Sequence, residues 1–278
     1  MLNYIIEGDL VNENYGLSGE IISKFDHVIN VKTEQNKGFA VTDSKVVLAP
    51  YHIKVPDYIF KKILDNVDKG YQIKVNGKSI KYKQYNFEYD DKSIFKGKIR
   101  DCSSIEKGQL ITITEKVIKE AVGLGSLDDS ILNYPAILTD KENYDLSVLQ
   151  QEFYKKLANI IHKKKTINDL LGLGIGLTPT GDDFIVGYLS ALEANLIEDK
   201  LKIRDNIDLN KVFDKTTRVS ALHLKAAIKH RYNEKLVDLY KNIDVNEDQY
   251  INYAKRLIKV GNSSGLDMLT GLYFGLIM

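Results

Sequence analysis

The sequence has little of three features that each point to a class of protein: cysteine, net charge and long apolar runs. Its single cysteine, Cys102, excludes an intrachain disulfide and a zinc site built from cysteines, and it suits a reducing compartment. With 39 basic and 38 acidic residues, the net charge of +1 gives no electrostatic reason to expect a nucleic-acid or membrane partner. The longest apolar stretch, MLTGLYFGLIM at the C-terminus, is too short to cross a bilayer.

The N-terminal sequence, MLNYIIEGDL, lacks the basic segment and the apolar run of a signal peptide. We therefore expect a cytoplasmic protein that binds neither nucleic acid nor membrane. The chain has 278 residues, of which 44% are hydrophobic and 28% charged. This length suffices for one large domain or two smaller ones with buried cores.

The first hundred or so residues are predicted to be rich in β-strands. Three segments within 19–89 alternate apolar and polar residues and are rich in valine, isoleucine and tyrosine. Asn76-Gly77 is a strong hairpin signal, and one short helix is expected after Pro56. We predict a β-rich N-terminal domain over 1–115, with a barrel-like sheet as one option.

The hydrophobic period becomes helical from about residue 144 onward. Five apolar side chains between 146 and 160 form one stripe, as in an amphipathic helix. Residues 116–143 are predicted to be a connector, and a passage from strand to helix is expected within 111–126. The predicted fold class is α+β, in which the β-rich domain precedes an all-α domain over 144–278. Further helices are expected at 180–197, 209–231, 233–242, 247–260 and 264–277.

Two stretches of the helical half share one pattern. TPTGDDFIVG at 178–187 and SSGLDMLTG at 263–271 each contain a hydroxyl residue, a glycine, an aspartate and a second glycine at equal spacing. The pattern is either a helix start used twice or two halves of one site. The aligned pairs are Thr180 with Ser264, Gly181 with Gly265, Asp183 with Asp267 and Gly187 with Gly271.

A purely structural interpretation accounts for much of this pattern. Ser/Thr-x-x-Asp before an apolar run resembles a capping box, in which Thr180 and Ser264 cap their helices and Asp183 and Asp267 reach back to the cap. Such a cap is worth about 1 kcal/mol. The small residues spaced four apart in both stretches also permit close helix packing. This interpretation needs no ligand.

The glycines before the first stretch indicate a binding function instead. LGLGIGLTPTG contains four glycines within ten residues, and glycine is a poor helix former. A glycine-rich loop that leads into a helix offers exposed backbone amides to an anion. The loop matches neither the Walker pattern nor the dinucleotide fingerprint. The candidate anion-binding residues in this region are Gly174, Gly176, Thr178, Thr180 and Gly181.

The adjacent carboxylates Asp182 and Asp183 also exceed what a helix cap requires, because one capping box uses one carboxylate. Two carboxylates beside an anion repel it unless a cation lies between them. A Mg²⁺ ion held by Asp182 and Asp183 would reconcile the two charges. These residues are therefore candidate metal ligands, and no organic cofactor is expected.

The second stretch repeats the design with a cluster of polar residues before Asp267. If the two helix starts converge, they bring hydroxyls, amides and three aspartates to one polar pocket. The candidate binding residues of the second stretch are Asn262, Ser263, Ser264 and Gly265.

The segment TTRVSALHLKAAIKH is a candidate third wall of this pocket. Thr217 and Ser220 share a helical face, and Arg218 is a candidate clamp for an anion. His223 follows one turn later and is a candidate general acid, general base or ligand. A satisfied structural histidine remains the plainer alternative for His223.

GLGIGLTPTGDDFIVGYLSAL resembles the signature GLGPGLTPSGDD of a bacterial family, the AllH-type subunit of oxamate carbamoyltransferase. TTRVSALHLKAA and VGNSSGLDMLTGL resemble the other two recurring stretches of that family. The resemblance covers the helical half, and the β-rich half only in general layout. Ile175 stands where the family commonly has proline, and Thr180 stands where it commonly has serine.

The resemblance implies a subunit of an enzyme that converts oxalurate and phosphate to oxamate and carbamoyl phosphate. It implies other enzyme subunits as partners and small anions as substrates. Phosphate would be the nucleophile, so the protein would position the reactants and stabilise developing charge. Asp182, Asp183, Asp267 and His223 are then the candidate catalytic residues.

Two other functions fit the same residues. A stand-alone metal-dependent hydrolase would use the three aspartates on a small anionic substrate. A non-catalytic scaffold subunit would use both stretches only as capped, closely packed helices.

Overall fold

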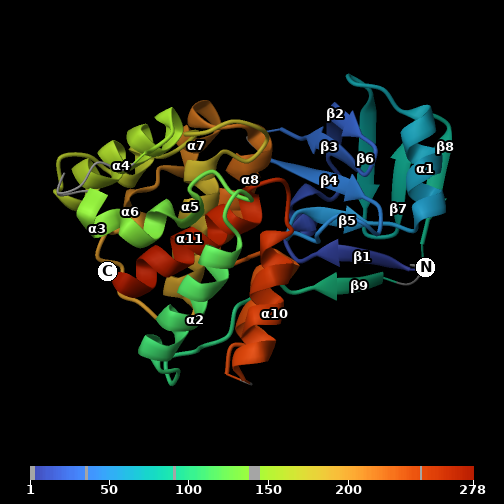
Figure 1. The fold of residues 1–278 in the computed structure, drawn as a ribbon. Coiled ribbons are helices and arrows are strands. Elements are labelled where there is room, and N and C mark those ends of the chain that lie inside the picture. The colour runs from blue at the N-terminus through green and yellow to red at the C-terminus, as the bar shows by residue number, and fades with distance from the viewer. Residues whose placement is uncertain (1–3, 35–36, 90–91, 138–144, 245) are drawn as a thin grey trace. The chain divides into compact units, whose positions relative to one another are not determined.

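The computed structural model describes the chain in five segments and divides it into two compact units (Figure 1). Unit 1 comprises 1–98 together with 231–234, and unit 2 comprises 99–230 and 235–278. Strands build the first unit and helices build the second, so the predicted α+β fold class is confirmed. The described segments are 4–34, 37–89, 92–137, 145–244 and 246–278.

Unit 1 is built on one mixed sheet of nine strands that curls into a half-barrel. The strand order is β8-β7-β6-β2-β3-β4-β5-β1-β9. Pairing is antiparallel except for β1 with β9 and β4 with β5. The strands are β1 (Ile5–Gly8), β2 (Ser18–Phe25), β3 (Val28–Lys32), β4 (Gly38–Thr42), β5 (His52–Lys54), β6 (Gln72–Asn76), β7 (Ser79–Tyr82), β8 (Tyr85–Glu88) and β9 (Lys92–Phe95).

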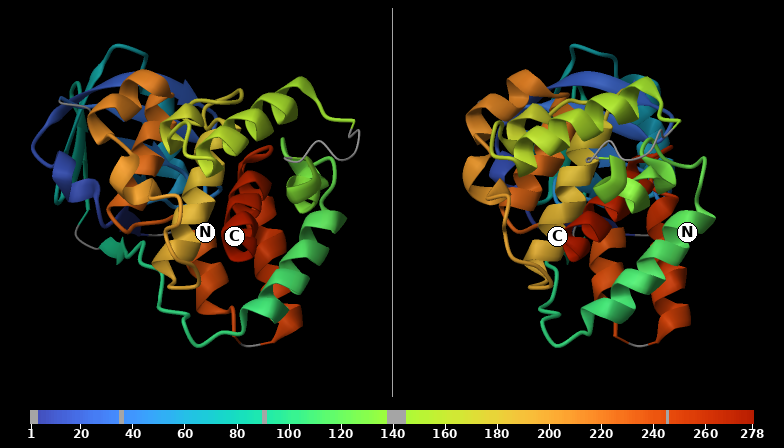
Figure 2. Two further views of the ribbon diagram at one scale, coloured as in Figure 1. Left: turned by 90° about the vertical axis from the view of Figure 1, so that its left-hand side faces the viewer. Right: turned by 60° about the vertical axis from the view of Figure 1, so that its left-hand side comes forward.

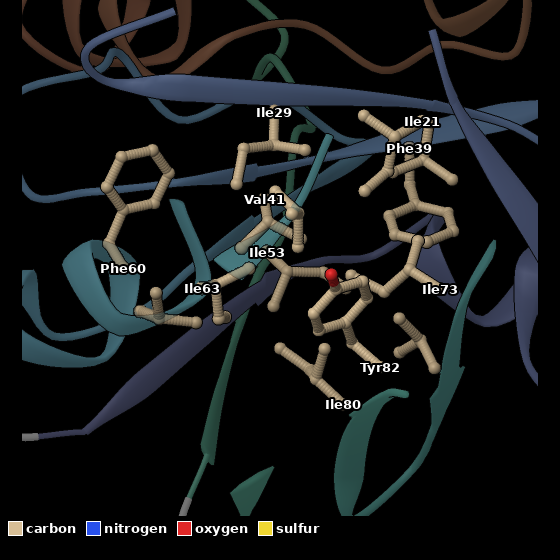
Figure 3. Close-up of a cluster of buried hydrophobic side chains, with 14 of the residues drawn as sticks. Ile21, Ile29, Phe39, Val41, Ile53, Phe60, Ile63, Ile73, Ile80 and Tyr82 are labelled. Atoms are coloured by element: carbon tan, nitrogen blue, oxygen red, sulfur yellow. The ribbon is translucent and has the colours of Figure 1, made fainter. Parts of the chain in front are cut away.

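The alternating pattern of the sequence explains how this sheet buries one face. Ile73 and Val75 of β6 are fully buried, whereas the residues between and beside them are more exposed. The Asn76-Gly77 turn joins β6 to β7 as an antiparallel hairpin, as predicted. Helix α1 (Asp57–Asn66) adds Phe60 and Ile63 to the same hydrophobic cluster (Figure 3).

Unit 1 ends at Lys98 in the first part of the chain, whereas the sequence predicts a boundary near 115. A short return segment, Arg231–Glu234, completes the unit through sequence-distant contacts. The Tyr232 amide donates to the Gly97 carbonyl at 2.7 Å, and the Arg231 guanidinium pairs with Asp9 at 2.5 Å. Sequence periodicity does not reveal such contacts, because they depend on where the chain returns in space.

Unit 2 is helical, and α5 and α11 pack against each other within it (Figure 2). Short 3-10 helices occur at Val11–Asn14 in unit 1 and at Asp128–Asn133 and Ile167–Asp169 in unit 2. None of the helices in the described segments is long and apolar enough to span a bilayer. The remaining helices are α2 (Lys107–Glu120), α3 (Tyr134–Ile137), α4 (Val148–Ile161), α5 (Thr180–Glu193), α6 (Ile203–Asn206), α7 (Leu209–Lys215), α8 (Arg218–Ile228), α9 (Glu234–Lys241), α10 (Glu247–Ile258) and α11 (Ser264–Ile277).

The single helix predicted over 209–231 is wrong, because the chain forms two helices there. Thr217 is extended, and its hydroxyl accepts a hydrogen bond from the Ser220 amide at 3.1 Å. A threonine side chain that caps a new helix start competes with continuation of the preceding helix. The break therefore follows from Thr217 and gives α8 its own N-terminus.

The strand-to-helix passage predicted within 111–126 is also wrong. Helix α2 occupies 107–120, and its buried residues Leu110, Ile113, Thr114 and Val117 recur at helical spacing. The β-branched residues in ITIT suggest a strand locally, but burial along one helical face decides the conformation. The predicted connector over 116–143 thus begins inside a helix, and its last part, 138–143, lies outside the described residues.

Glycine allows the backbones of α5 and α11 to approach closely. A Cβ at Gly187 would lie 1.9 Å from the Met268 carbonyl oxygen, and one at Gly271 would lie 2.0 Å from the Phe184 carbonyl oxygen. Phe184 and Met268 hold equivalent positions in the two repeated stretches, so the two contacts are reciprocal. The predicted close packing at these glycines is confirmed, and it places both helix starts at one end of the pair.

Substitution of Gly271 by alanine should destabilise unit 2, because its Cβ would collide with backbone that cannot rotate away. We expect a loss of about 3 kcal/mol in the free energy of unfolding, measured by urea denaturation. Gly108→Ala is the matched control, since its Cβ would meet nothing closer than 3.8 Å. That control should leave stability unchanged or raise it by up to about 1 kcal/mol. Equal effects of the two substitutions would contradict this account of the helix crossing.

Candidate functional site

A cleft of about 600 Å³ lies in unit 2 where three loops meet. Its walls are residues 123–126, 175–178 and 261–264. The second wall leads into α5 and the third leads into α11. The two repeated stretches therefore meet in space, and their helix starts share one cleft. The lining residues are Gly123, Leu124, Gly125, Ser126, Ile175, Gly176, Leu177, Thr178, Gly261, Asn262, Ser263 and Ser264.

The glycine-rich loop owes its path to backbone conformations that other residues rarely adopt. Gly172, Gly174 and Gly176 have φ angles of 74°, 120° and 90°. A Cβ at Gly174 would lie 2.7 Å from the Thr180 amide nitrogen, so the loop folds tightly onto the start of α5. The Ile175 side chain is 88% exposed and stands at the edge of the cleft.

Asp182 ties the glycine-rich loop and α8 to α5. One carboxylate oxygen accepts the Gly172 amide at 2.9 Å, and the other accepts the hydroxyls of Ser220, at 2.7 Å, and Thr216. Burial raises the pKa of Asp182, and these hydrogen bonds partly offset that rise. Both oxygens are thus engaged, so Asp182 acts as a positioning residue, and a metal-binding role would require breaking these bonds.

Asp183 and Asp267 form a pair of buried carboxylates, one from each helix start. Their exposed fractions are 1% and 0%. Asp267 Oδ1 accepts the amides of Ser126 at 3.2 Å and Leu127 at 3.4 Å. Within the described part of the chain, the Oδ2 atoms of Asp183 and Asp267 have no hydrogen-bond partner. Unsatisfied buried polar atoms are rare in native proteins, so each of these oxygens calls for an explanation such as a catalytic role or a bound ion or water.

Burial dominates the protonation behaviour of both carboxyl groups. It raises the pKa of Asp183 well above its usual range, and the charge of Asp267 raises it further. Burial also raises the pKa of Asp267 to about 6, against the opposing effects of the Ser263 hydroxyl and the Ser126 and Leu127 amides. The charge of Asp267 therefore disfavours ionisation of Asp183.

The capping boxes predicted at the two helix starts are wrong. Thr180 and Ser264 are the first helical residues, and the N-cap positions belong to Pro179 and Ser263, neither of which caps through its side chain. The hydroxyls act across the pair instead. Ser264 lowers the pKa of the Asp on α5, and Thr180 lowers that of the Asp on α11. The hydroxyl of each stretch thus serves the aspartate of the other.

Hydroxyl groups from both stretches face the cleft. The Thr178 and Ser264 hydroxyls are 2.7 Å apart, and the Ser126 and Ser263 hydroxyls are 3.4 Å apart. None of the described residues that line the cleft carries a charge. The polar character of the cleft therefore comes from hydroxyls, backbone groups, the Asn262 amide and two helix N-termini.

The start of α8 supports the loop from behind and does not belong to the described lining of the cleft. The Thr217 hydroxyl donates to the Leu177 carbonyl, and Ser220 contacts Asp182 as described above. Arg218 lies 5.2 Å from the Phe213 ring, and its Nη1 atom is buried without a hydrogen-bond partner in the described part of the chain. Anion binding by Arg218 would therefore require its side chain to move.

His223 follows on the same helix, one turn after Ser220. Burial lowers its pKa to about 4, so the imidazole is neutral at pH 7. It lies outside the described cleft lining. A catalytic role for His223 stays a prediction, and its environment disfavours the charged form.

The first wall of the cleft, residues 123–126, is absent from the predicted site. Asp128 organises it by accepting the amides of Gly123 and Gly125, each at 3.0 Å. The pattern GLGSLDD, with two glycines before a serine and an aspartate, resembles the glycine-rich loop before α5 and is a usable signal. It was hidden because the whole region reads as a connector.

The donor atoms in unit 2 set limits on metal binding. No group of three or more histidine, cysteine, aspartate or glutamate side chains that could hold a metal occurs among the described residues. Any metal at the cleft would have to use fewer protein carboxylates and complete its shell with hydroxyls, water or a bound anion.

Residues 170–276 match the family model described as "Oxamate carbamoyltransferase subunit AllH". The match begins just before the glycine-rich loop and includes α5, α8 and α11, with two of the three cleft walls. It confirms the resemblance that the sequence motifs indicate. No solved structure matches the chain.

Asp182→Ala should destabilise the protein, because it removes three hydrogen bonds and leaves buried donors without an acceptor. We expect a loss of about 3 kcal/mol in the free energy of unfolding, measured by urea denaturation. Asp129→Ala changes a partly exposed aspartate of the same unit and should stay within about 0.5 kcal/mol of wild type. If Asp182→Ala is as stable as wild type, the three hydrogen bonds of Asp182 are not needed for stability.

His223 should contribute a loss of stability as the pH is lowered from 6.5 to 4, whereas the raised pKa values of Asp183 and Asp267 act in the opposite direction over part of this range. In this range the unfolded chain protonates His223, whereas the folded chain keeps it neutral until about pH 4. The expected loss from this group is about 3 kcal/mol. His223→Gln should remove that part of the pH dependence in denaturation curves, and the exposed His162→Gln should not. Parallel wild-type and His223→Gln curves would contradict the prediction.

Proposed function

We propose that this chain, whose residues 170–276 belong to the AllH family, is a subunit of a carbamoyl-transferring enzyme and binds a small anionic reactant in its cleft. The family name supports a subunit of oxamate carbamoyltransferase. Under this proposal, oxalurate and phosphate are converted to oxamate and carbamoyl phosphate, and other subunits assemble with this chain.

The cleft suits small anions because two helices direct their N-termini into it. Both α5 and α11 are 14 residues long, and their first residues adjoin the cleft walls. A helix N-terminus carries partial positive charge. The Gly181 and Gly265 amides already donate to the Leu173 and Val260 carbonyls, so the attraction comes from the helix dipoles and the hydroxyls. Phosphate, carbamoyl phosphate and oxalurate are all anions, so each is a reasonable ligand for this end of the helix pair.

The hydroxyl pair Thr178 and Ser264 is the observation that carries the proposal. The pair joins the two repeated stretches at 2.7 Å and lies in the cleft wall. During transfer, a phosphate oxygen attacks the carbamoyl carbon, the carbonyl oxygen gains negative charge, and the oxamate nitrogen leaves with a proton. Hydroxyl and amide donors fixed around that carbonyl oxygen would stabilise the charge as it develops.

Under this proposal the chain contributes positioning and charge stabilisation, and no covalent intermediate on the protein is needed. The cleft holds no charged side chain among its described lining residues, so a bound dianion would still need a positive group. Another subunit or a bound cation would have to supply it. The proposal thus explains why such a site would occur in a subunit.

Ser264→Ala should weaken carbamoyl phosphate binding, measured by isothermal titration calorimetry, by about tenfold or more. The reason is the loss of a hydrogen bond to a charged ligand, worth about 1.5 to 3 kcal/mol. Ser103→Ala, an exposed serine of the same unit outside the cleft, is the control and should bind like wild type. The same variants should rank identically in carbamoyl phosphate formation by the assembled enzyme.

Phosphate and oxalurate are titrated in the same way, with the isolated chain and with the assembled enzyme. Absence of binding by all three anions, together with full activity of an enzyme containing Ser264→Ala, would favour the scaffold subunit. Turnover by the isolated chain would favour the stand-alone hydrolase.

A further inference from the structure

The unpaired oxygens of Asp183 and Asp267 point to a ligand that the hydrogen-bond network leaves out. Both side chains are more than nine-tenths buried, and each has one oxygen without a partner in the described part of the chain. The other oxygen of Asp267 accepts the Ser126 and Leu127 amides, and the Thr178 and Ser264 hydroxyls lower the pKa of Asp183. Each helix start thus contributes one buried carboxylate oxygen without a hydrogen-bond partner in the described part of the chain.

Two buried carboxyl groups that interact electrostatically require either a positive partner or a proton. An unpaired buried charge costs several kcal/mol, and two that repel each other cost more. In the described structure, no lysine or arginine lines the cleft, and no salt bridge involves either aspartate. A cation or a shared proton must supply the compensation.

The position of the pair favours a cation. Of the four hydroxyls that interact with Asp183 and Asp267, those of Thr178, Ser263 and Ser264 line the cleft, and that of Thr180 lies outside the lining. An anion bound in the cleft would therefore lie near both carboxylates and be repelled by them. A shared proton would remove one of these charges, whereas a divalent cation would balance both and attract the anion.

We propose that Asp183 and Asp267 bind one divalent metal ion of the Mg²⁺ class between the starts of α5 and α11. The donors are hard oxygens, which suit Mg²⁺ or Mn²⁺ and not a metal that prefers sulfur or imidazole. Mg²⁺ is commonly held by one or two carboxylates, with water and substrate phosphate oxygens completing the shell. The site therefore needs no third carboxylate.

This site differs from the one predicted at Asp182 and Asp183, because Asp182 has both oxygens engaged. It takes one ligand from each copy of the repeated stretch. Both copies have aspartate at the equivalent position although neither uses it in a helix cap. Binding of one ion explains both aspartates. The role of the ion toward an anion rests on the proposed function, whereas ion binding itself does not.

The experiment is a titration of the purified chain with Mn²⁺, followed by electron paramagnetic resonance of the free ion, with Mg²⁺ as competitor and no anion present. Wild type should bind one Mn²⁺ per chain, and Mg²⁺ should displace it. Asp183→Asn and Asp267→Asn, which keep the side-chain shape, should each weaken binding at least tenfold. Asp129→Asn should bind like wild type, because Asp129 is a partly exposed aspartate of the same unit outside the described cleft lining.

Three results would overturn the proposal. If wild type binds no Mn²⁺ at millimolar concentration and Asp183→Asn or Asp267→Asn raises the melting temperature, the two carboxyl groups share a proton. If wild type and both asparagine variants bind Mn²⁺ equally well, the ion lies elsewhere. If neither variant folds, the wild-type titration decides. Any result other than one bound Mn²⁺ per chain that Mg²⁺ displaces would contradict the site.

Failure of the ion site and failure of the proposed function give different results. If carbamoyl phosphate binds without Mg²⁺ and Ser264→Ala abolishes that binding, the proposed anion site is supported and the metal site is contradicted. If one Mn²⁺ binds tightly and none of the anions binds, the metal site is supported and the proposed substrates are contradicted.

Discussion

The close approach of α5 and α11 is the constraint on which the rest of unit 2 depends. Glycine at both crossing points lets each helix rest on a backbone carbonyl of the other. At this separation the first turns of the two helices stand close enough for side chains to serve the opposite helix. The buried aspartate pair, the shared hydroxyls and the cleft above them all follow from that separation.

The exchange of hydroxyls also explains why the repeated sequence resembles two capping boxes without forming them. A capping box and a crossed pair both need a hydroxyl and a carboxylate three residues apart at a helix start. Which one forms depends on whether a second helix start is near enough to take the hydroxyl. The tight crossing supplies that neighbour, and the local cap gives way to a contact between helices.

The sequence predicts those features whose signal is local. Alternation over 19–89 predicts a β-rich unit, apolar periodicity predicts most helices, and the paired motifs predict a polar site at two helix starts. The different roles of the aspartates are not predictable from the sequence, because Asp182 and Asp183 are neighbours in sequence yet have different surroundings. One is satisfied by the loop and α8, and the other is left with a free oxygen beside Asp267.

Features that depend on chain return were also beyond prediction. The wall at 123–126 joins the site because the chain returns at α11, where Asp267 accepts the Ser126 and Leu127 amides and the Ser263 hydroxyl contacts that of Ser126. The helical break at Thr217 is not predicted, because a threonine in the middle of the segment does not interrupt its pattern of apolar residues. In each case a residue distant in sequence, or a single side-chain hydrogen bond, decides the local structure.

The return segment Arg231–Glu234 has a consequence for the order in which the chain folds during synthesis. Unit 1 receives its last residues only after the whole stretch 99–230 has left the ribosome. The sheet can begin to form early, but the contacts at Gly97 and Asp9 must wait for most of the second unit. Cutting the chain at one position therefore cannot yield two complete units, because unit 1 contains residues from both sides of 99–230.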